Sequence, residues 1–211
     1  MGLLQKTSIA LEISHGGIAG ALVVQRAKSA TLLRATRIPL PDECLSNSLK
    51  ELQVLQPEAF VRALREAWGS LHSSLRQVAL SLPDSAGRTV LMQLDEPWKQ
   101  RAEAVDLLRW KLGKRMGMSP DLLHLDFQVL ERKQDGATQL LVALTHRSVI
   151  QQYEELALEA GLQPTQIGFH TLHLQQLFNR LPLQTGLIIT LYDTVLGTCA
   201  LADNKPVFYR V

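Results

Sequence analysis

The sequence predicts an α/β (α+β) protein, and three observations support this class. The chain opens and closes with three consecutive strand patterns joined by short connections, which favours antiparallel meanders. Between the two meanders, segments with the 3.6-residue period of a helix alternate with short strands. Hydrophobic residues make up 46% of the 211 residues, which is enough to bury a core.

The opening meander organises the rest of the chain. Over residues 7–14, apolar residues alternate with small or polar ones, which predicts a strand with one buried face. Gly16 and Gly17 allow a tight turn. The nearly all-apolar residues 18–24 predict a second strand with both faces covered, and residues 31–40 predict the third strand.

Two amphipathic helices are predicted in the middle of the chain. A polar connector with at most one helical turn precedes the first helix, which begins at Pro57 because proline suits a first helical turn. Short strands over residues 78–82 and 89–94 lead to the second helix, over residues 96–116. Its exposed side is basic, which predicts either a binding face or a solvated helix surface. The apolar stripes of the two helices are Phe60, Val61, Leu64, Ala67, Trp68 and Leu71, and Ala104, Leu107, Leu108, Leu112 and Met116.

The remaining elements follow the same logic. An Asp-Gly turn joins two strands within residues 122–145, and a helix runs from Ser148, the expected N-cap, to Ala160. Gly161 then suits a left-handed C-terminal cap. The last predicted elements are a strand (163–169), a helix (170–181) and the second meander (187–192, 196–202 and 207–211).

The repeated meander predicts an internal duplication, with a meander at the start of each unit. The second meander has an apolar face with no following element to bury it. We therefore expect a fragment, or a shortened protein, whose second domain lacks its body.

Composition excludes several classes of function. The net charge is +2 with scattered basic residues, so no nucleic-acid surface is predicted. Cys44 and Cys199 lie far apart without metal-ligand spacing, which fits a reducing cytosol, and no acid or cysteine joins His170 and His173 at ligand spacing. No signal peptide and no apolar run of about 18 residues is present, so we expect a soluble protein or the soluble part of a larger one.

Five short segments, taken in order, resemble the type IV pilus assembly protein PilM. The resemblance extends to its relatives in mannose-sensitive pilus and type II secretion systems, which are FtsA-like members of the actin/Hsp70 ATPase superfamily. It covers residues 7–211 and rests on the ordered set rather than on one motif. The segments are residues 78–85, 107–111, 125–130, 140–143 and 160–164.

This resemblance implies a particular domain organisation. Residues 1–87 and 164–183 would form an actin/RNase H-like core subdomain, and residues 88–163 an inserted small α+β subdomain of the FtsA/PilM type. Residues 184–211 would begin a second actin-like domain that is incomplete. The same resemblance implies two phosphate loops, which this sequence alters.

In the first loop, Glu12 stands where the family has Asp, Ser14 and His15 lie in the turn with Gly16 and Gly17, and Ala19 replaces a lysine. In the second loop, Thr190 and Tyr192 replace the acid and the glycine of an Asp-x-Gly motif, and Asp193 and Thr194 follow. A tyrosine at a position of close backbone approach is a steric obstacle to phosphate. We expect no enzymatic activity and no cofactor, with weak binding of ATP and Mg²⁺ as the alternative.

The resemblance implies a cytoplasmic scaffold at the inner face of the bacterial inner membrane, within a pilus or type II secretion platform. Its expected partner is the cytoplasmic N-terminal tail of a single-span membrane protein, bound in a groove between the core and inserted subdomains. Membrane association would come only through such partners, and no nucleic acid is expected. The alternative function is a nucleotide-dependent FtsA-like switch or weak ATPase.

Overall fold

The computed structural model describes residues 6–26, 29–48, 52–134, 136–178, 184–192 and 195–211, with the backbone alone at residues 175–178. The chain divides into two compact units. The first unit contains residues 1–83 and 151–170, and the second contains residues 84–150 and 171–211. The two units are described in turn.

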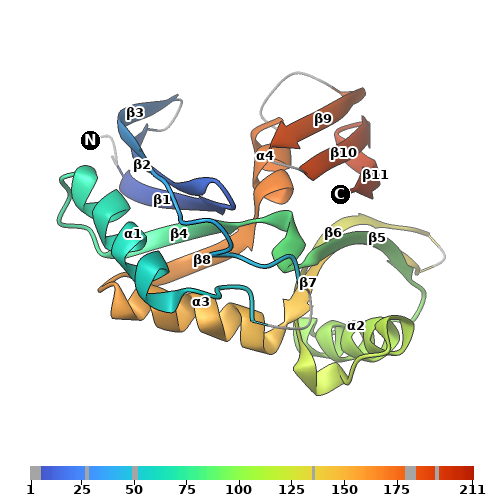
Figure 1. Ribbon diagram of the computed structural model, residues 1–211. Coiled ribbons are helices and arrows are strands. Elements are labelled where there is room, and N and C mark those ends of the chain that lie inside the picture. Colours follow the sequence, from blue (N-terminus) through green and yellow to red (C-terminus); the bar gives the residue numbers. More distant parts are fainter. Residues whose placement is uncertain (1–5, 27–28, 49–51, 135, 179–183, 193–194) are drawn as a thin grey trace. The chain divides into compact units, whose positions relative to one another are not determined.

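A five-stranded mixed sheet forms the centre of the first unit (Figure 1). Its strand order is β3-β2-β1-β4-β8. The β1–β3 meander is antiparallel, whereas β4 runs parallel to both β1 and β8. The predicted opening meander is therefore confirmed. The strands are β1 (Lys6–Ser14), β2 (Gly17–Arg26), β3 (Ser29–Ile38), β4 (Gln77–Leu82) and β8 (Gln163–Phe169).

One face of this sheet is buried under two helices, α1 (Pro57–Ser70) and α3 (Arg147–Glu159), the latter from residue 151 onward in this unit. The register places Leu11 opposite Leu80 and Ile9 opposite Leu22, so apolar side chains share that face. The rings of Phe60 on α1 and Tyr153 on α3 pack edge to face, with their centroids 5.8 Å apart. This contact joins the two helices.

The side-chain amide of Gln152 ties the connector before α1 to α3. Gln152 Oε1 accepts hydrogen bonds from the backbone N–H groups of Gln53 (2.9 Å) and Val54 (3.0 Å). Its Nε2 donates to the carbonyl oxygen of Val54 at 2.9 Å. No helical turn forms among the connector's described residues; an isolated bridge between Leu45 and Val54 replaces it.

The opposite face of the sheet is lined by small and polar side chains. On β2, Ala19, Ala21 and Val23 are half-buried on this face, while Gly20 and Leu22 are buried on the other. The prediction that both faces of β2 are covered is therefore wrong. The run of apolar residues in β2 misled because two of the three on this face are alanines, whose small side chains need no covering layer.

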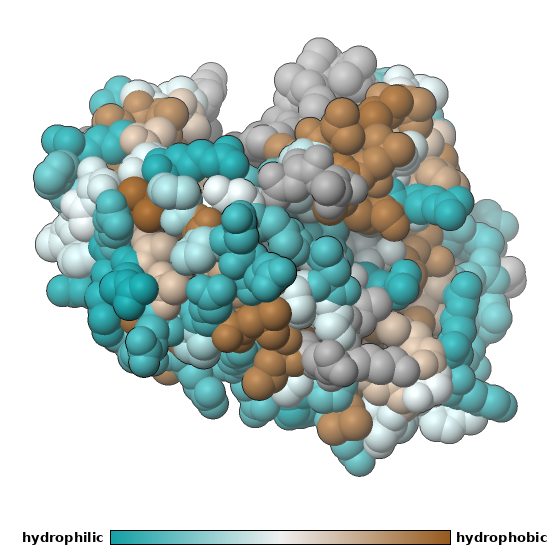
Figure 2. All heavy atoms as spheres, in the orientation of Figure 1, coloured by the Kyte–Doolittle hydropathy of each residue, from teal (hydrophilic) through white to brown (hydrophobic). Residues whose placement is uncertain are grey.

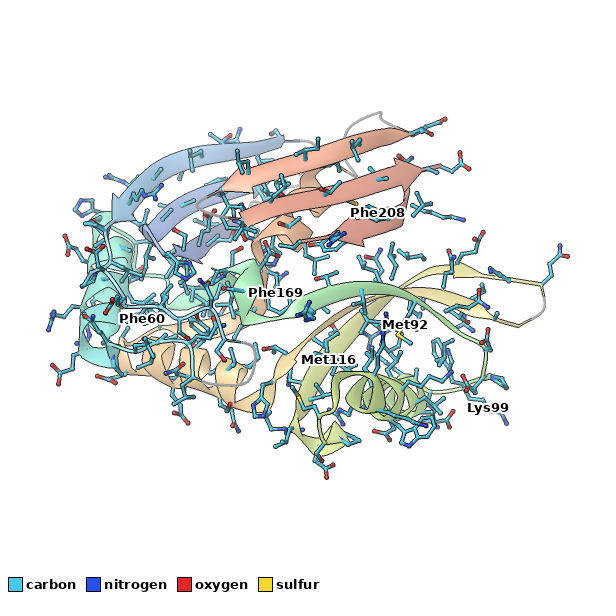
Figure 3. All side chains as sticks on the ribbon, turned by 45° about the vertical axis from the view of Figure 1, so that its right-hand side comes forward. Phe60, Met92, Lys99, Met116, Phe169 and Phe208 are labelled. Atoms are coloured by element: carbon cyan, nitrogen blue, oxygen red, sulfur yellow. The ribbon has the colours of Figure 1, made fainter. Side chains whose placement is uncertain are left out.

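In the second unit, a three-stranded antiparallel sheet of order β5-β7-β6 packs against α2 (Arg101–Met116). Met92 and Met116 lie between the sheet and the helix at the margin of this core (Figure 3). The strands are β5 (Arg88–Leu94), β6 (Leu123–Arg132) and β7 (Thr138–His146). The core residues are Leu94, Ala104, Leu108, Leu112, Leu123, Leu125, Phe127, Leu140, Val142 and Leu144.

Two predicted helix starts are wrong. Helix α2 begins at Arg101 rather than at residue 96, because the Glu103 carboxylate accepts hydrogen bonds from the backbone N–H groups of Lys99 (2.8 Å) and Gln100 (3.4 Å). Helix α3 begins at Arg147, so Ser148 lies inside its first turn. The Ser148 hydroxyl instead meets His146 Nδ1 at 2.7 Å. The left-handed Gly161, with φ +82°, is confirmed.

The second meander forms a separate three-stranded sheet of order β11-β10-β9, with α4 (His170–Phe178) before it in the chain. Its inner face buries Ile188, Cys199 and Leu201 beside Tyr209. Its outer face is apolar and exposed, visible as the brown area over these strands in Figure 2. The strands are β9 (Gly186–Tyr192), β10 (Val195–Ala202) and β11 (Lys205–Arg210). The outer residues, 48% to 78% exposed, are Leu187, Ile189, Leu191, Leu196 and Phe208.

Among the described residues, no helix is long and apolar enough to cross a membrane.

Candidate functional site

Glu12 lies on the open face of the first unit's sheet, near the end of β1. The register places it beside Ala19 of β2 and Ser81 of β4. Its carboxylate Oε2 is 3.4 Å from His170 Nδ1, and its side chain is 43% exposed against 12% for that of His170. Glu12 is therefore paired with a protein side chain, although the resemblance would place a metal-binding acid at this position.

A second basic side chain, that of Arg37, lies in the same row of residues. Arg37 of β3 is the cross-strand partner of Ala19, which in turn is the partner of Glu12. The hydrogen bond from His170, followed by the charges of His170 and Arg37, holds the pKa of Glu12 below its ordinary value although burial opposes this. Positive charge therefore reaches Glu12 from β3 and from the residue after β8, and not from the lysine position at residue 19.

One side chain of the turn after β1 is bonded within the turn. Ser14 Oγ donates a hydrogen bond to the Gly17 carbonyl oxygen at 3.1 Å, and both residues are buried. Gly17 has φ +145°, and a Cβ there would overlap the Ile38 carbonyl oxygen of β3. Gly17 thus permits close strand packing. His15 is half-buried and Gly16 is exposed at the tip of the turn.

In the second unit, Thr190 and Tyr192 belong to a buried polar cluster around Asp84. The Tyr192 hydroxyl donates a short hydrogen bond to Asp84 Oδ2 and accepts one from the Asp84 backbone N–H at 3.2 Å. Thr171 donates to the same Oδ2 through its hydroxyl (2.7 Å) and its backbone N–H (3.1 Å). The hydroxyls of Thr171 and Thr190 are 3.4 Å apart.

The cluster is almost closed to solvent. Asp84 and Thr190 are each 8% exposed and Thr171 is 2% exposed. Burial, and then the hydrogen bond and charge of Asp84, raise the pKa of Tyr192 well above its ordinary value. Tyr192 therefore acts as a neutral hydrogen-bond donor to a carboxylate over the whole physiological range.

Gly197 makes the cluster possible. It is the cross-strand partner of Thr190 in the β9–β10 hairpin. A Cβ at residue 197 would overlap the Thr190 hydroxyl and lie 2.7 Å from Thr171 Oγ1. The hydroxyls of Thr190 on β9 and Thr171 on α4 can both approach β10 here because this position has no side chain.

The predicted site residues fall into two groups. Glu12, Ser14, His15, Gly16 and Gly17 lie together at one end of the β1–β2 hairpin in the first unit. Thr190 and Tyr192 lie in the second unit, on one face of β9. Asp193 and Thr194 lie outside the described residues.

Sequence reasoning missed four partners, namely Arg37, Asp84, His170 and Thr171. Arg37 could have been found by counting register through β2, since the short turns fix the pairing of the first three strands. Asp84 lies in the resemblance segment 78–85, but no local pattern marks its distant partners.

The residues present do not fit a magnesium-bound nucleotide in either loop taken by itself. In the first, the Ser14 hydroxyl and the Glu12 carboxylate are bonded within the protein. In the second, Thr190 offers no carboxylate to a metal ion, and the Tyr192 hydroxyl is bonded to Asp84. Among the residues that the structure describes, no group of three or more His, Cys, Asp or Glu could hold a metal ion.

Comparison with known proteins gives matches in structure only. No protein-family model matches the sequence, and a search of curated proteins found no match. A chain of the PilM–PilN type IV pilus biogenesis complex superposes with a TM-score of 0.80 and 21% identity, over 96% of this chain and 60% of that one.

Two further solved structures share the fold. The cytoplasmic domain of EpsL, an inner-membrane component of the type II secretion system of Vibrio cholerae, has a TM-score of 0.58 and 10% identity, covering 94% of this chain and 69% of that one. A Bacteroides thetaiotaomicron protein with an actin-like ATPase fold and unknown function has a TM-score of 0.50 and 10% identity, covering 96% and 68%.

The chain thus spans 60% of the length of the PilM–PilN chain that it matches. At these identities the likeness concerns the fold. The predicted resemblance is confirmed at that level: the chain has a PilM-like, actin-like ATPase fold.

Proposed function

We propose that this chain is a cytoplasmic scaffold of a type IV pilus or type II secretion inner-membrane platform, and that it binds the cytoplasmic tail of a membrane-anchored partner. The observation that carries the proposal is the superposition on a chain of the PilM–PilN complex over 96% of the present chain at a TM-score of 0.80. The EpsL cytoplasmic domain adds support from a second system with an inner-membrane component.

The altered loops favour a scaffold over a nucleotide-dependent switch. A switch must exchange a bound anion, so its loop groups must be available to that anion. Here the Ser14 hydroxyl bonds the Gly17 carbonyl oxygen and the Tyr192 hydroxyl bonds Asp84. These intramolecular bonds support a function that does not cycle with ATP.

We also propose the domain division implied by the family. Residues 1–87 and 164–183 form the core subdomain, residues 88–163 the inserted subdomain, and residues 184–211 the start of a second actin-like domain. The packing of α2 on the β5-β7-β6 sheet supports the middle assignment, because those elements share one apolar core. The division can be tested by expressing residues 88–163 alone and asking whether the fragment unfolds cooperatively.

A peptide tail suits the proposed partner on physical grounds. An extended peptide contributes main-chain hydrogen bonds and places alternate apolar side chains in pockets. Such complexes bury a modest surface area, so we expect a dissociation constant in the micromolar range. This corresponds to a binding free energy of about −8 kcal/mol. Apolar contacts would dominate, so raising salt from about 0.05 to 0.5 M should change the affinity only slightly.

The experiment is fluorescence anisotropy with a labelled peptide from the cytoplasmic N-terminus of the proposed single-span partner, sought first in the protein encoded next to this chain. A scrambled peptide of the same composition is the control, and circular dichroism verifies that the protein is folded. Saturable micromolar binding of the native peptide supports the scaffold. No binding at hundreds of micromolar by the folded protein contradicts it.

A further inference from the structure

We infer that Asp84 is a built-in anion that fills the N-terminus of helix α4, and that Tyr192 closes this site from β9. The inference concerns the second unit alone and does not depend on the identity of any partner. It assigns a positive role to Tyr192, which the resemblance places in the second phosphate loop: Tyr192 helps to hold the Asp84 carboxylate, and that carboxylate supplies from the chain the negative charge that the helix terminus attracts.

The helix terminus explains why a carboxylate is stable in this buried place. The first backbone N–H groups of a helix have no partner within the helix, and the helix dipole favours negative charge beside them. Thr171 is the second residue of α4, and its backbone N–H and hydroxyl both donate to Asp84 Oδ2, at 3.1 and 2.7 Å. This geometry is the one by which helix termini hold phosphate or carboxylate groups.

Tyr192 completes the set of donors to the carboxylate. Its hydroxyl donates to the same Oδ2 and in return accepts the Asp84 backbone N–H at 3.2 Å. The carboxylate oxygen therefore receives three hydrogen bonds, from α4 and from β9. A buried charge is tolerated when its hydrogen bonds are satisfied in this way.

The backbone that presents Asp84 is itself fixed. Asp84 begins the short 3₁₀ helix η1 (Asp84–Ala86), directly after β4 in the chain. The Ala86 carbonyl oxygen accepts a hydrogen bond from Thr145 Oγ1 of β7, and the Gly87 N–H bonds back to the Asp84 carbonyl oxygen at 3.4 Å. The cluster thus joins η1, α4 and β9, while η1 is anchored to β7. An external anion is not needed to hold these segments together.

The test is anion rescue of a variant that lacks the carboxylate. Asp84→Ala removes the built-in anion and leaves its donors, and the melting temperature is measured in formate and in inorganic phosphate against chloride at equal ionic strength. Asp121→Ala is the matched control, because Asp121 is an exposed aspartate in the same unit. We expect Asp84→Ala to melt at least about 5 °C below wild type, and formate or phosphate to restore part of that loss.

The wild-type protein and Asp121→Ala should show no such dependence on the anion. Equal melting of wild type and Asp84→Ala, or an equal response of all three proteins to both anions, overturns the inference. If Asp84→Ala does not fold, Asp84→Asn keeps the shape and removes the charge, and Tyr192→Phe removes one donor. We expect each of these to melt about 3–10 °C below wild type, with faster amide exchange in the first turn of α4. Wild-type melting and exchange in both variants would equally overturn it.

Discussion

Tyr192 and Asp84 bind each other in both directions: the phenol donates to the carboxylate and accepts the backbone N–H of the same residue. Tyr192, at the position where the resemblance expects a glycine, is thus engaged by a carboxylate of its own unit. In the first unit, Glu12 is likewise paired with another side chain of the protein, that of His170. Each relationship leads to a measurement.

Ionisation of the tyrosines should be coupled to unfolding. Burial is the main cause that raises the pKa of Tyr153, Tyr192 and Tyr209, which are all three tyrosines of the chain. The folded pKa values lie above the unfolded value of about 10, so the protonated tyrosines favour the folded state. This contribution to stability is complete below about pH 10 and is lost as the pH rises further. Tyrosinate absorbance should therefore appear only with loss of the native circular dichroism. A tyrosinate signal with its midpoint near pH 10 in protein that is still folded would refute this.

Gly197→Ala should destabilise the second unit. The added methyl group would overlap the Thr190 hydroxyl and come within 2.7 Å of Thr171 Oγ1, so the β9–β10 hairpin or α4 must shift. We expect a loss of about 1–3 kcal/mol in the free energy of unfolding, measured by denaturant titration. Gly186→Ala is the control, since a Cβ at residue 186 meets nothing within 4 Å. Equal effects of the two substitutions would show that the close approach at residue 197 is unimportant.

Glu12→Gln should weaken the dependence of stability on pH. The folded pKa of Glu12 lies below its ordinary value of 4.5, so its ionised form stabilises the protein above that value and the contribution is lost as the pH falls. His170 and Arg37 supply the opposing charges. The wild type should therefore lose more stability than Glu12→Gln as the pH falls from about 5 to about 3. Glu66→Gln, an exposed glutamate on α1, should behave like the wild type; a Glu12→Gln protein with an unchanged pH profile would count against the pairing.

Leu108→Ala tests the packing of α2. Leu108 is fully buried against the β5-β7-β6 sheet, so its truncation should cost about 2–5 kcal/mol. Leu122 is 44% exposed in the same unit, and its truncation to alanine should cost less than about 1 kcal/mol. Denaturant titration of both variants decides the matter. A loss below about 1 kcal/mol for Leu108→Ala would place that residue in solvent.

Local patterns predicted most of the elements, because the hydrophobic period of a strand or an amphipathic helix can be read from neighbouring residues. The alternation around Ile9 and Leu11, the proline at residue 57 and the glycine at residue 161 each mark a structure that needs no distant partner. The predicted start of α2 at residue 96 was wrong because the Glu103 carboxylate caps the backbone N–H groups of Lys99 and Gln100, and the helix begins at Arg101.

The candidate site was less predictable for a physical reason. Glu12, Thr190 and Tyr192 could be named from their place in the resemblance, but their partners are set by strand register and by segments far away in the sequence. Asp84 and Tyr192 are 108 residues apart. A buried carboxylate needs specific donors around it, and only the fold shows where those donors are.

The most direct test of the account is a pair of calorimetric titrations on one sample of the folded chain. Titration with the partner's tail peptide should release heat with a micromolar dissociation constant, with or without nucleotide. Titration with ATP and Mg²⁺ should give no saturable heat, because Thr190 offers no carboxylate and the Tyr192 hydroxyl is bound to Asp84. Low-micromolar binding of ATP together with no binding of the peptide would contradict the account and favour a nucleotide-dependent switch.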